Sequence, residues 1–379
     1  MTLRILVGLP SFNEAETIAT VTRDIDAALS AAPFPVTALL VNADNSSTDR
    51  TAEQFLTTAT QHPKRVLTTA HASGKGTNWQ ALFRLLDEGE FDIGVMVDTD
   101  LGGVPASWIH KLIIAASDSD FAFPLRPPTW NGGDLTYQLA YPMLAGVFGA
   151  DLREPLCGDI ALSRRGAKLV LDQNWTDSAH RFGVDALVAS VALSSSWRMV
   201  PLQERRRNKL RSFSGGFGMG PKFAEVAISL QERCRLRLGH PPPQRFDAAP
   251  MATPAGDSRP VPAQDADISQ LAAETSLRLA ADLGTGATNH LPEALTDQLR
   301  ERSSSGALPQ GLPWPLWREV LLAWIRDQHR EIPISLLETL FLSRVVGHHH
   351  EIKGRADWYG TVRDQARDLF DHCRSLWSS

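Results

Sequence analysis

Short apolar runs alternate with amphipathic segments through the amino-terminal half of the chain, and this alternation limits the possible folds more than any other feature. The runs at residues 4–9, 35–42, 65–68 and 93–97 predict strands, the first of them buried, and the segments between them carry apolar residues at helical spacing. Strands that alternate with helices form βαβ units, whose strands lie parallel. The sequence therefore predicts an α/β fold with a mostly parallel sheet flanked by helices.

The loops that follow three of these predicted strands are polar. They are Pro10–Glu14, Asp44–Thr51 and Asp98–Asp100. Because ligands of such sheets bind at the carboxyl ends of the strands, these loops are candidate site segments rather than plain turns.

Asp98 and Asp100 place two carboxylates two residues apart at the end of an apolar strand. If strand geometry continues, both side chains lie on the same side. Two like charges disfavour each other, and a divalent cation such as Mg²⁺ or Mn²⁺ offsets them. Such an ion also stabilises a diphosphate leaving group. An exposed turn at the strand end is the alternative.

Three other segments each admit two interpretations. In the segment Asp44–Thr51, the Asp44 carboxylate is suited to accept a hydrogen bond from a ring N–H of a base. The alternative is that this segment only caps the start of the next helix. Lys75 lies between two glycines that let the backbone approach an anion, or the segment is a solvated turn. Asp159 follows a glycine in an apolar stretch and faces a pocket or forms a turn.

The second half of the chain has a different composition. Residues 240–267 are rich in proline and alanine and show no periodicity, which predicts a linker or mobile loop. Helical spacing returns at 269–283, 314–329, 334–346 and 357–377. We therefore expect an α/β domain at 1–239, the linker at 240–267 and a helical region at 268–379.

Composition narrows the class of protein. The formal net charge of −5 argues against broad nucleic-acid binding. No run of 18 apolar residues occurs and no signal peptide is expected, so we predict no membrane span. The three cysteines are far apart and odd in number, which fits a reducing, cytoplasmic location.

Taken in order, these segments resemble the GT-A fold nucleotide-sugar glycosyltransferases, whose sheet is Rossmann-like. Pro10–Glu14 is similar to their Pro-x-Tyr-Asn-Glu opening, and Asp44–Thr51 to their Asp-Asp-Gly-Ser-Thr-Asp-x-Thr loop. Gly74–Gly76 matches a Gly-Lys-Gly loop, and Asp98–Asp100 matches the Asp-x-Asp metal motif.

Later segments resemble the retaining glucosyl-3-phosphoglycerate synthase and mannosylglycerate synthase group in particular. Glu154–Asp159 is similar to its Gln-Pro-Leu-x-Gly-Glu segment, residues 132–136 to its Gly-Gly-x-Val-Thr loop, and Phe182–Asp185 to its Tyr-Gly-Val-Glu segment. The matched spacing covers about residues 4–215.

The resemblance implies a hexosyltransferase that moves a sugar from a UDP- or GDP-sugar to a small acceptor with retention of configuration. The implied donor-binding residues are Pro10, Asn13, Glu14, Asp44, Gly74, Lys75 and Asp98. Asp100 and Asp98 would hold Mg²⁺ or Mn²⁺. Asp159, near the donor sugar, and Asp185, on the acceptor side, are the implied catalytic residues. Gly133, Asp134 and Thr136 would form the acceptor loop.

The chain departs from this group at two positions. The histidine that completes the metal site is missing, and Asn208 falls near its position as a weaker oxygen ligand. Asp134 stands where relatives have an arginine for the acceptor phosphate, and a carboxylate repels an anion. The resemblance with this change implies a neutral or cationic acceptor.

Two other classes compete with this interpretation. A nucleotidyltransferase shares the α/β core, but the Pro10–Glu14 loop argues against it. A non-catalytic nucleotide-sugar-binding or scaffold protein is favoured by the missing histidine and disfavoured by the retained Asp98 and Asp100. The ten tryptophans are interpreted as core residues or as homodimer contacts rather than as sugar-stacking residues.

Overall fold

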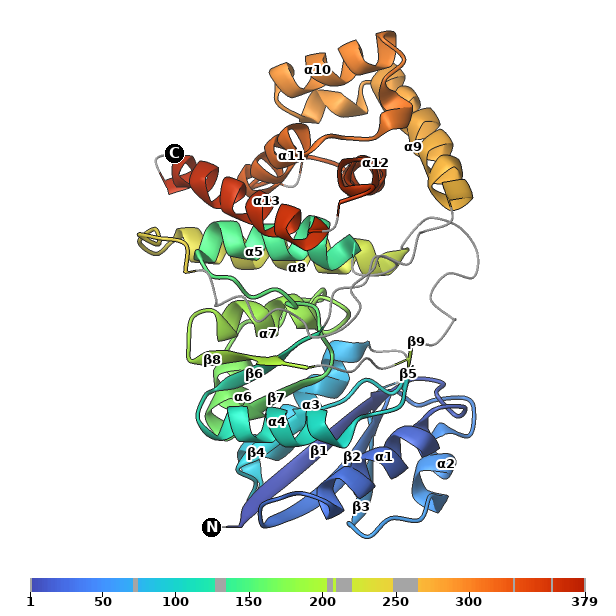
Figure 1. Ribbon diagram of the computed structural model, residues 1–379, viewed down its shortest axis with the longest axis vertical. Helices are drawn as coiled ribbons and strands as arrows, with labels where there is room; N and C mark the ends of the chain where they lie inside the picture. The colour runs from blue at the N-terminus through green and yellow to red at the C-terminus, as the bar shows by residue number, and fades with distance from the viewer. Residues whose placement is uncertain are drawn as a thin grey trace. The chain divides into compact units, whose positions relative to one another are not determined.

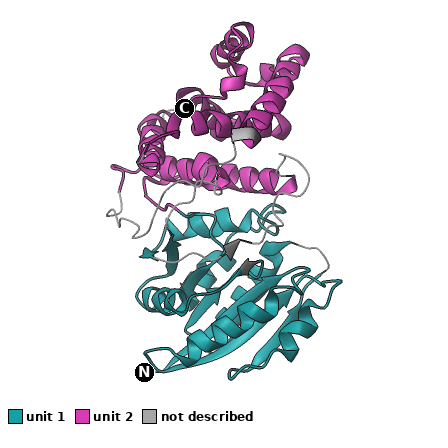
Figure 2. Ribbon diagram, turned by 45° about the vertical axis from the view of Figure 1, so that its right-hand side comes forward, with its two compact units in different colours: residues 1–127, 154–216, 252–256 teal, residues 128–153, 217–251, 257–379 magenta. Residues whose placement is uncertain are grey.

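A computed structural model describes residues 2–70, 74–126, 134–202, 207–208, 220–247, 265–329, 331–355 and 357–377. The chain divides into two compact units, coloured teal and magenta in Figure 2. Unit 1 comprises Met1–Pro127, Glu154–Gly216 and Ala252–Gly256, and unit 2 comprises Pro128–Arg153, Phe217–Met251 and Asp257–Ser379. Each unit is described by itself, and the boundaries expected at 239 and 267 stay predictions.

Unit 1 contains a seven-stranded sheet in the order β3-β2-β1-β4-β7-β6-β8. Its strands are β1 (Leu3–Ser11), β2 (Val36–Asp44), β3 (Lys64–Thr68), β4 (Ile93–Met96), β6 (Phe121–Leu125), β7 (Ile160–Ser163) and β8 (Trp197–Pro201). Strand β7 runs antiparallel to β4 and β6, and the other described pairings in this sheet are parallel. A separate pair joins β5 (Leu101–Gly102) to β9 (Arg207–Asn208). The predicted α/β class with a mostly parallel sheet is confirmed.

Helices cover both faces of this sheet (Figure 1). They are α1 (Ile18–Ser30), α2 (Thr51–Thr57), α3 (Lys75–Glu88), α4 (Ala106–Ser117), α6 (Arg164–Leu171) and α7 (Val184–Ala192). On one face, Ile5, Val7 and Leu9 of β1 share a core with α1 and α4. On the other face, a Cβ added to Gly8 would lie 2.7 Å from Leu82 of α3. Burial on both faces explains why these strands read as nearly continuous apolar runs.

Unit 2 is helical in its described part. Its elements are η1 (Leu135–Ala140), α5 (Tyr141–Phe148), α8 (Pro221–Leu238), α9 (Asp265–Thr285), η3 (Ala287–His290), α10 (Glu293–Ser304), η4 (Leu308–Gln310), α11 (Trp314–Arg326), α12 (Ile334–Ile352), α13 (Trp358–Cys373) and η5 (Arg374–Trp377). The four helices predicted after residue 268 are confirmed. No helix in the described part of either unit combines the length and hydropathy that crossing a bilayer requires.

The tryptophans of α11 are core residues of unit 2. Trp317 and Trp324 are almost completely buried. The Trp317 indole N–H donates to the Gln138 carbonyl at 2.6 Å, and that of Trp324 donates to the Ala227 carbonyl at 3.3 Å. Buried indoles with satisfied N–H groups stabilise a core. The core interpretation is confirmed for these two residues, which join α11 to the segments at 134–153 and 220–247.

Candidate functional site

Four charged side chains meet at the carboxyl ends of the strands of unit 1. Lys75 begins α3, Asp98 follows β4, Asp159 precedes β7, and Asp185 lies in the first turn of α7. Because β7 is antiparallel to β4, its amino end lies beside the carboxyl end of β4, where Met96 pairs with Ile160. The antiparallel strand thus delivers Asp159 to the same edge as the parallel strands.

The contacts within this group are direct. The Lys75 Nζ lies 3.0 Å from Asp185 Oδ1 and 3.3 Å from Asp98 Oδ1. The backbone N–H of Asp98 donates to Asp159 Oδ1 at 3.0 Å. Sequence reasoning selected all four residues, and the structure brings them together. We call these four residues the edge cluster.

The electrostatics of the edge cluster keep Lys75 positively charged. Burial alone lowers the pKa of the ammonium group, but the attraction of Asp185 and Asp98 outweighs it and raises the pKa. The Nζ also lies 5.0 Å from the centroid of the Trp79 ring. Two carboxylates therefore share one cation at a site that is largely buried.

Arg126 is a second cation near Asp159, which sequence reasoning missed. Its guanidinium donates to Glu154 at 2.8 Å. The pKa of Arg126 is raised well above its usual range by Cys157, Glu154 and Asp159. Burial raises the pKa of the Cys157 thiol to about 12, so this cysteine is not a nucleophile at neutral pH. Arg126 follows the apolar strand β6, and a cation after a strand is the signal that could have identified it.

Glycines permit the close packing of this edge. A Cβ on Gly158 would lie 2.1 Å from the Asp98 carboxylate, so the carboxylate fills the space that any side chain at position 158 would need. A Cβ on Gly76 would lie 1.9 Å from the Ala179 carbonyl, and Gly74, at φ +104°, would be 2.7 Å from the His180 carbonyl. The two glycines beside Lys75 thus let the segment before α7 pack closely against them, and the donor-binding role of Gly74 and Lys75 stays a prediction.

The loops after β1 and β2 are tied together by hydrogen bonds. Asn13, at φ 58°, donates its N–H to Ser47 Oγ at 2.9 Å and accepts from Thr48 N at 2.8 Å. Glu14 N donates to Thr51 Oγ1 at 2.7 Å. Asparagine tolerates this left-handed backbone conformation better than most residues. Asn13 and Glu14 therefore shape a surface loop at the same sheet edge.

Asp44 is the last residue of β2 and Pro10 the last but one of β1, so both lie directly before these loops. The Asp44 carboxylate accepts from Ser11 Oγ at 3.2 Å and from the N–H and hydroxyl groups of Ser47. The Pro10 carbonyl accepts from Thr99 Oγ1 at 2.8 Å and so connects β1 to the loop after β4. Among the described residues, Oδ1 of Asp44 accepts two of these hydrogen bonds and Oδ2 accepts one, so three of the roughly four lone-pair positions of the carboxylate are used within that part of the chain.

Asp98 and Asp100 differ in environment. Strand β4 ends at Met96, so the continued strand geometry on which a shared side for the two carboxylates depended is not present. Asp98 is half-buried and paired with Lys75, whereas Asp100 is exposed. Between them Thr99 is buried and bonded to β1, which turns the chain.

The metal-binding role predicted for Asp98 and Asp100 stays a prediction. Leu101 pairs with Asn208 in the β5–β9 ladder, so the Asn208 backbone lies beside the residue that follows Asp100. Among the described residues, no three His, Cys, Asp or Glu side chains are placed to hold a metal ion. Mg²⁺ is commonly held by one or two carboxylates together with substrate phosphates and water, and an exposed carboxylate meets that requirement.

The predicted acceptor residues belong to unit 2. Asp134 precedes η1 and Thr136 lies within it, while Gly133 lies outside the described residues. Asp134 is half-buried, and burial raises the pKa of its carboxyl group to about 6. The roles predicted for these residues and for the edge cluster stay predictions.

The sequence matches no protein-family profile and no curated protein. Solved structures of glucosyl-3-phosphoglycerate synthase from Mycobacterium tuberculosis are similar to the chain. One, in complex with Mg²⁺ and UDP, has a TM-score of 0.48 and 24% identity and covers 63% of this chain and 80% of that chain. Another, with Mn²⁺, UDP-glucose and phosphoglyceric acid, has a TM-score of 0.47 and 23% identity over 63% and 81%. The motifs quoted from the sequence resemble the same group of enzymes.

Proposed function

We propose that this chain is a glycosyltransferase that uses a nucleotide-diphosphate sugar, with UDP favoured over GDP, and a small neutral or cationic acceptor. The observation that carries the proposal is the edge cluster, in which one buried ammonium and three carboxylates meet beside two loops of matching motif. A glycosyl transfer has to orient sugar hydroxyls and stabilise a departing diphosphate. Carboxylates serve the first need and cations the second.

The donor base is assigned to the loops after β1 and β2. The remaining lone pair on Asp44 Oδ2 is suited to a ring N–H, and the bonds from Ser11 and Ser47 hold that carboxylate in one orientation. Asn13 and Glu14 fix the loop that borders it. In this proposal Pro10, whose carbonyl binds Thr99, sets the distance between the base site and the edge cluster.

The sugar is assigned to the edge cluster. Asp98 and Asp159 are suited to accept hydrogen bonds from donor-sugar hydroxyls, with Asp185 on the acceptor side. Lys75 holds Asp98 and Asp185 in place and supplies positive charge near the diphosphate. In the front-face route usually assigned to retaining relatives, the leaving phosphate helps to deprotonate the acceptor, and we extend that route to this chain.

A divalent ion completes the proposal. Asp100 would hold Mg²⁺ or Mn²⁺, with the Asn208 amide as a further ligand and the diphosphate supplying others. Asp98 is the weaker candidate ligand because its carboxylate is already paired with Lys75. The ion would neutralise the diphosphate. A site with so few protein ligands would bind the ion weakly until the nucleotide is present.

Calorimetric titration tests the donor and the metal together. UDP-glucose, UDP-N-acetylglucosamine, GDP-mannose and GDP-glucose are each titrated with Mg²⁺, with Mn²⁺ and with EDTA. We expect one nucleotide sugar to bind in a metal-dependent manner, and Mn²⁺ alone to bind at least ~10-fold more weakly than Mn²⁺ with UDP. Failure of every donor to bind, with or without metal, would contradict the proposal.

Transfer assays with the bound donor then test the acceptor and the edge cluster. A panel of polyols, aminocyclitols and other small amines is compared with 3-phosphoglycerate, and best activity with 3-phosphoglycerate would refute a neutral or cationic acceptor. Asp185→Asn should lower kcat/KM by ~100-fold or more. Asp172→Asn is the matched control, because Asp172 is exposed and pairs at 3.8 Å with Lys168 at i,i+4.

A non-catalytic nucleotide-sugar-binding protein is the second candidate. It is favoured by the ion pair between Asp98 and Lys75, which engages the first carboxylate of the metal motif. The two candidates differ in one result. Tight donor binding without transfer to any acceptor and without donor hydrolysis would support the non-catalytic protein.

A further inference from the structure

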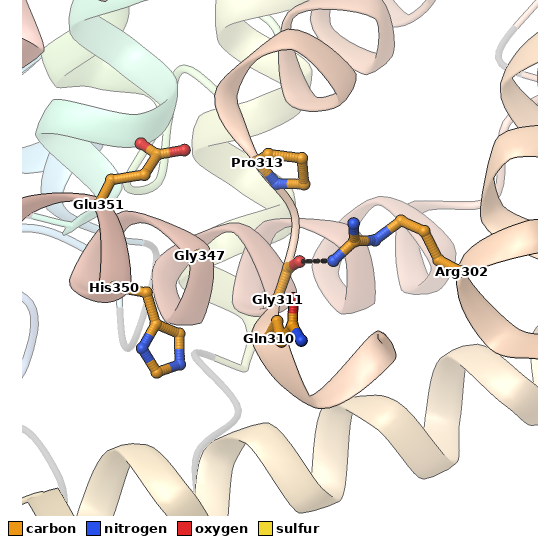
Figure 3. A pocket seen from close by; sticks show the side chains of 7 residues that line it. All are labelled: Arg302, Gln310, Gly311, Pro313, Gly347, His350 and Glu351. Carbon is orange, nitrogen blue, oxygen red and sulfur yellow. Dashed lines mark hydrogen bonds between the residues drawn. The ribbon is translucent and has the colours of Figure 1, made fainter. Parts of the chain in front are cut away.

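Unit 2 contains a cavity of its own, with a volume of about 360 Å³. Figure 3 shows its lining, which comes from α10, from η4 and the linker after it, and from α12. The residues that matter for its chemistry are Arg302, Gln310, Gly311, Gly347, His350 and Glu351. Small-molecule sites commonly have volumes of about 300–1,000 Å³, so this cavity lies at the lower end of that range.

Two glycines form the wall between the linker and α12. A Cβ on Gly311, at φ +70°, would lie 2.3 Å from Gly347 N, and a Cβ on Gly347 would lie 2.0 Å from the Leu312 carbonyl. Leu312 N donates to the Ser343 carbonyl at 2.9 Å. Backbone therefore packs directly on backbone here, and the polar side chains beside this contact line the cavity.

The charge of Glu351 is already balanced. Its carboxylate accepts from Arg344 Nη1 at 2.7 Å and from Nη2 at 2.6 Å. It also accepts from Trp314 N at 2.9 Å and from Gln365 Nε2 at 3.0 Å. Arg344 is fully buried, so its guanidinium depends on this carboxylate. Glu351 therefore adds little net negative charge to the cavity.

The charge of Arg302 is not balanced in this way. Its Nη2 donates to the carbonyls of Ala307 at 2.9 Å and Gly311 at 2.7 Å, and the second bond is drawn in Figure 3. Its Nε is buried and has no hydrogen-bond partner in the described part of the chain. No carboxylate of the described residues forms an ion pair with it, and burial lowers its pKa. A half-buried guanidinium held by neutral carbonyls is poised for an anion.

We propose that this cavity binds a small molecule through an anionic group, a carboxylate or a phosphate, that pairs with Arg302. A guanidinium presents a planar set of donors that matches either oxyanion. The Gln310 amide and the exposed His350 ring lie on the same cavity and are suited to bond the rest of the ligand. The site lies wholly within unit 2 and does not depend on the function proposed for unit 1.

The test uses the full chain and calorimetric titration with inorganic phosphate and, separately, with malonate, at constant ionic strength set by sodium chloride. Arg302→Met should weaken binding by at least ~10-fold, because it removes a charge-assisted contact. Arg300→Met is the matched control: Arg300 is on the same helix, is exposed, and pairs with Asp297 at 2.8 Å. It should leave the affinity unchanged. The two ligands distinguish a phosphate site from a carboxylate site.

Two further variants keep the test decisive if Arg302→Met does not fold. Arg302→Lys keeps the positive charge but loses the planar set of guanidinium donors, and His350→Ala alters an exposed side chain. Both variants should fold. Both should bind the preferred anion several-fold more weakly than wild type. Equal affinity in wild type and in every Arg302 variant that folds would overturn the proposal. The proposal would also be overturned if neither anion bound. It would be overturned as well if Lys75→Met abolished binding, because the anion would then bind in unit 1.

Discussion

Replacing Gly158 with alanine is expected to push the Asp98 carboxylate away from Lys75. The new Cβ would lie 2.1 Å from one carboxylate oxygen and 2.2 Å from the other, whereas Cβ contacts in proteins essentially never fall below 3.0 Å. The carboxylate has to retreat by about 0.9 Å, the difference between 2.1 and 3.0 Å. A movement of this size is enough to take the Lys75–Asp98 contact of 3.3 Å beyond hydrogen-bond reach if the carboxylate moves along the line between the two groups.

The expected loss of stability follows from two effects. Forcing a methyl group into a packed site costs about 1–3 kcal/mol. Weakening one of the two ion pairs of Lys75 adds about 1 kcal/mol, less than the loss of a whole buried pair because Asp185 remains 3.0 Å away. We therefore expect the free energy of unfolding to fall by about 2–4 kcal/mol while the chain stays folded.

Urea denaturation and donor titration measure the two consequences separately. Gly284→Ala is the matched control, because its Cβ would meet nothing within 4 Å inside α9 and alanine favours a helix by about 0.5–1 kcal/mol. Gly158→Ala should also weaken nucleotide-sugar binding by ~10-fold, since Asp98 is displaced. Unchanged stability together with unchanged donor affinity would refute the packing argument.

Three further predictions concern charged groups. Lys75→Met should lower the free energy of unfolding by about 2–4 kcal/mol, because it removes the cation shared by two carboxylates, and Lys75→Arg should recover part of the loss in urea titrations. Burial raises the pKa of Asp134 to about 6, so the folded state binds the extra proton and stability should fall as pH rises from about 4 to 6. Asp134→Asn should remove this decline, gaining up to about 3 kcal/mol at pH 7, and identical pH profiles would contradict the assignment. Arg344→Met should cost about 3–5 kcal/mol in denaturant titrations because Glu351 loses its buried partner, and Glu351→Gln in the same chain should restore part of it.

The mostly parallel α/β fold of unit 1 could be predicted from periodicity, but the antiparallel direction of β7 could not. The runs that became β1 and β4 are mostly buried on both faces, and such strands stand out as apolar runs, whereas the edge strand β3 is only partly buried. Strand β7 has four residues and pairs with both β4 and β6, and nothing in so short a run indicates that it is antiparallel. That direction is what delivers Asp159 to the edge cluster.

The sequence by itself determined which residues could take part: Lys75, Asp98, Asp159 and Asp185 were selected from local motifs and from their position after or before apolar strands. Only the tertiary structure decided their pairing, since Lys75 and Asp185 are 110 residues apart and meet through the packing of Gly74 and Gly76 against the segment before α7. The reason is physical. Periodicity reports burial within one element, whereas the partner of a charge depends on which backbones approach closely, and that depends on contacts between elements distant in the chain.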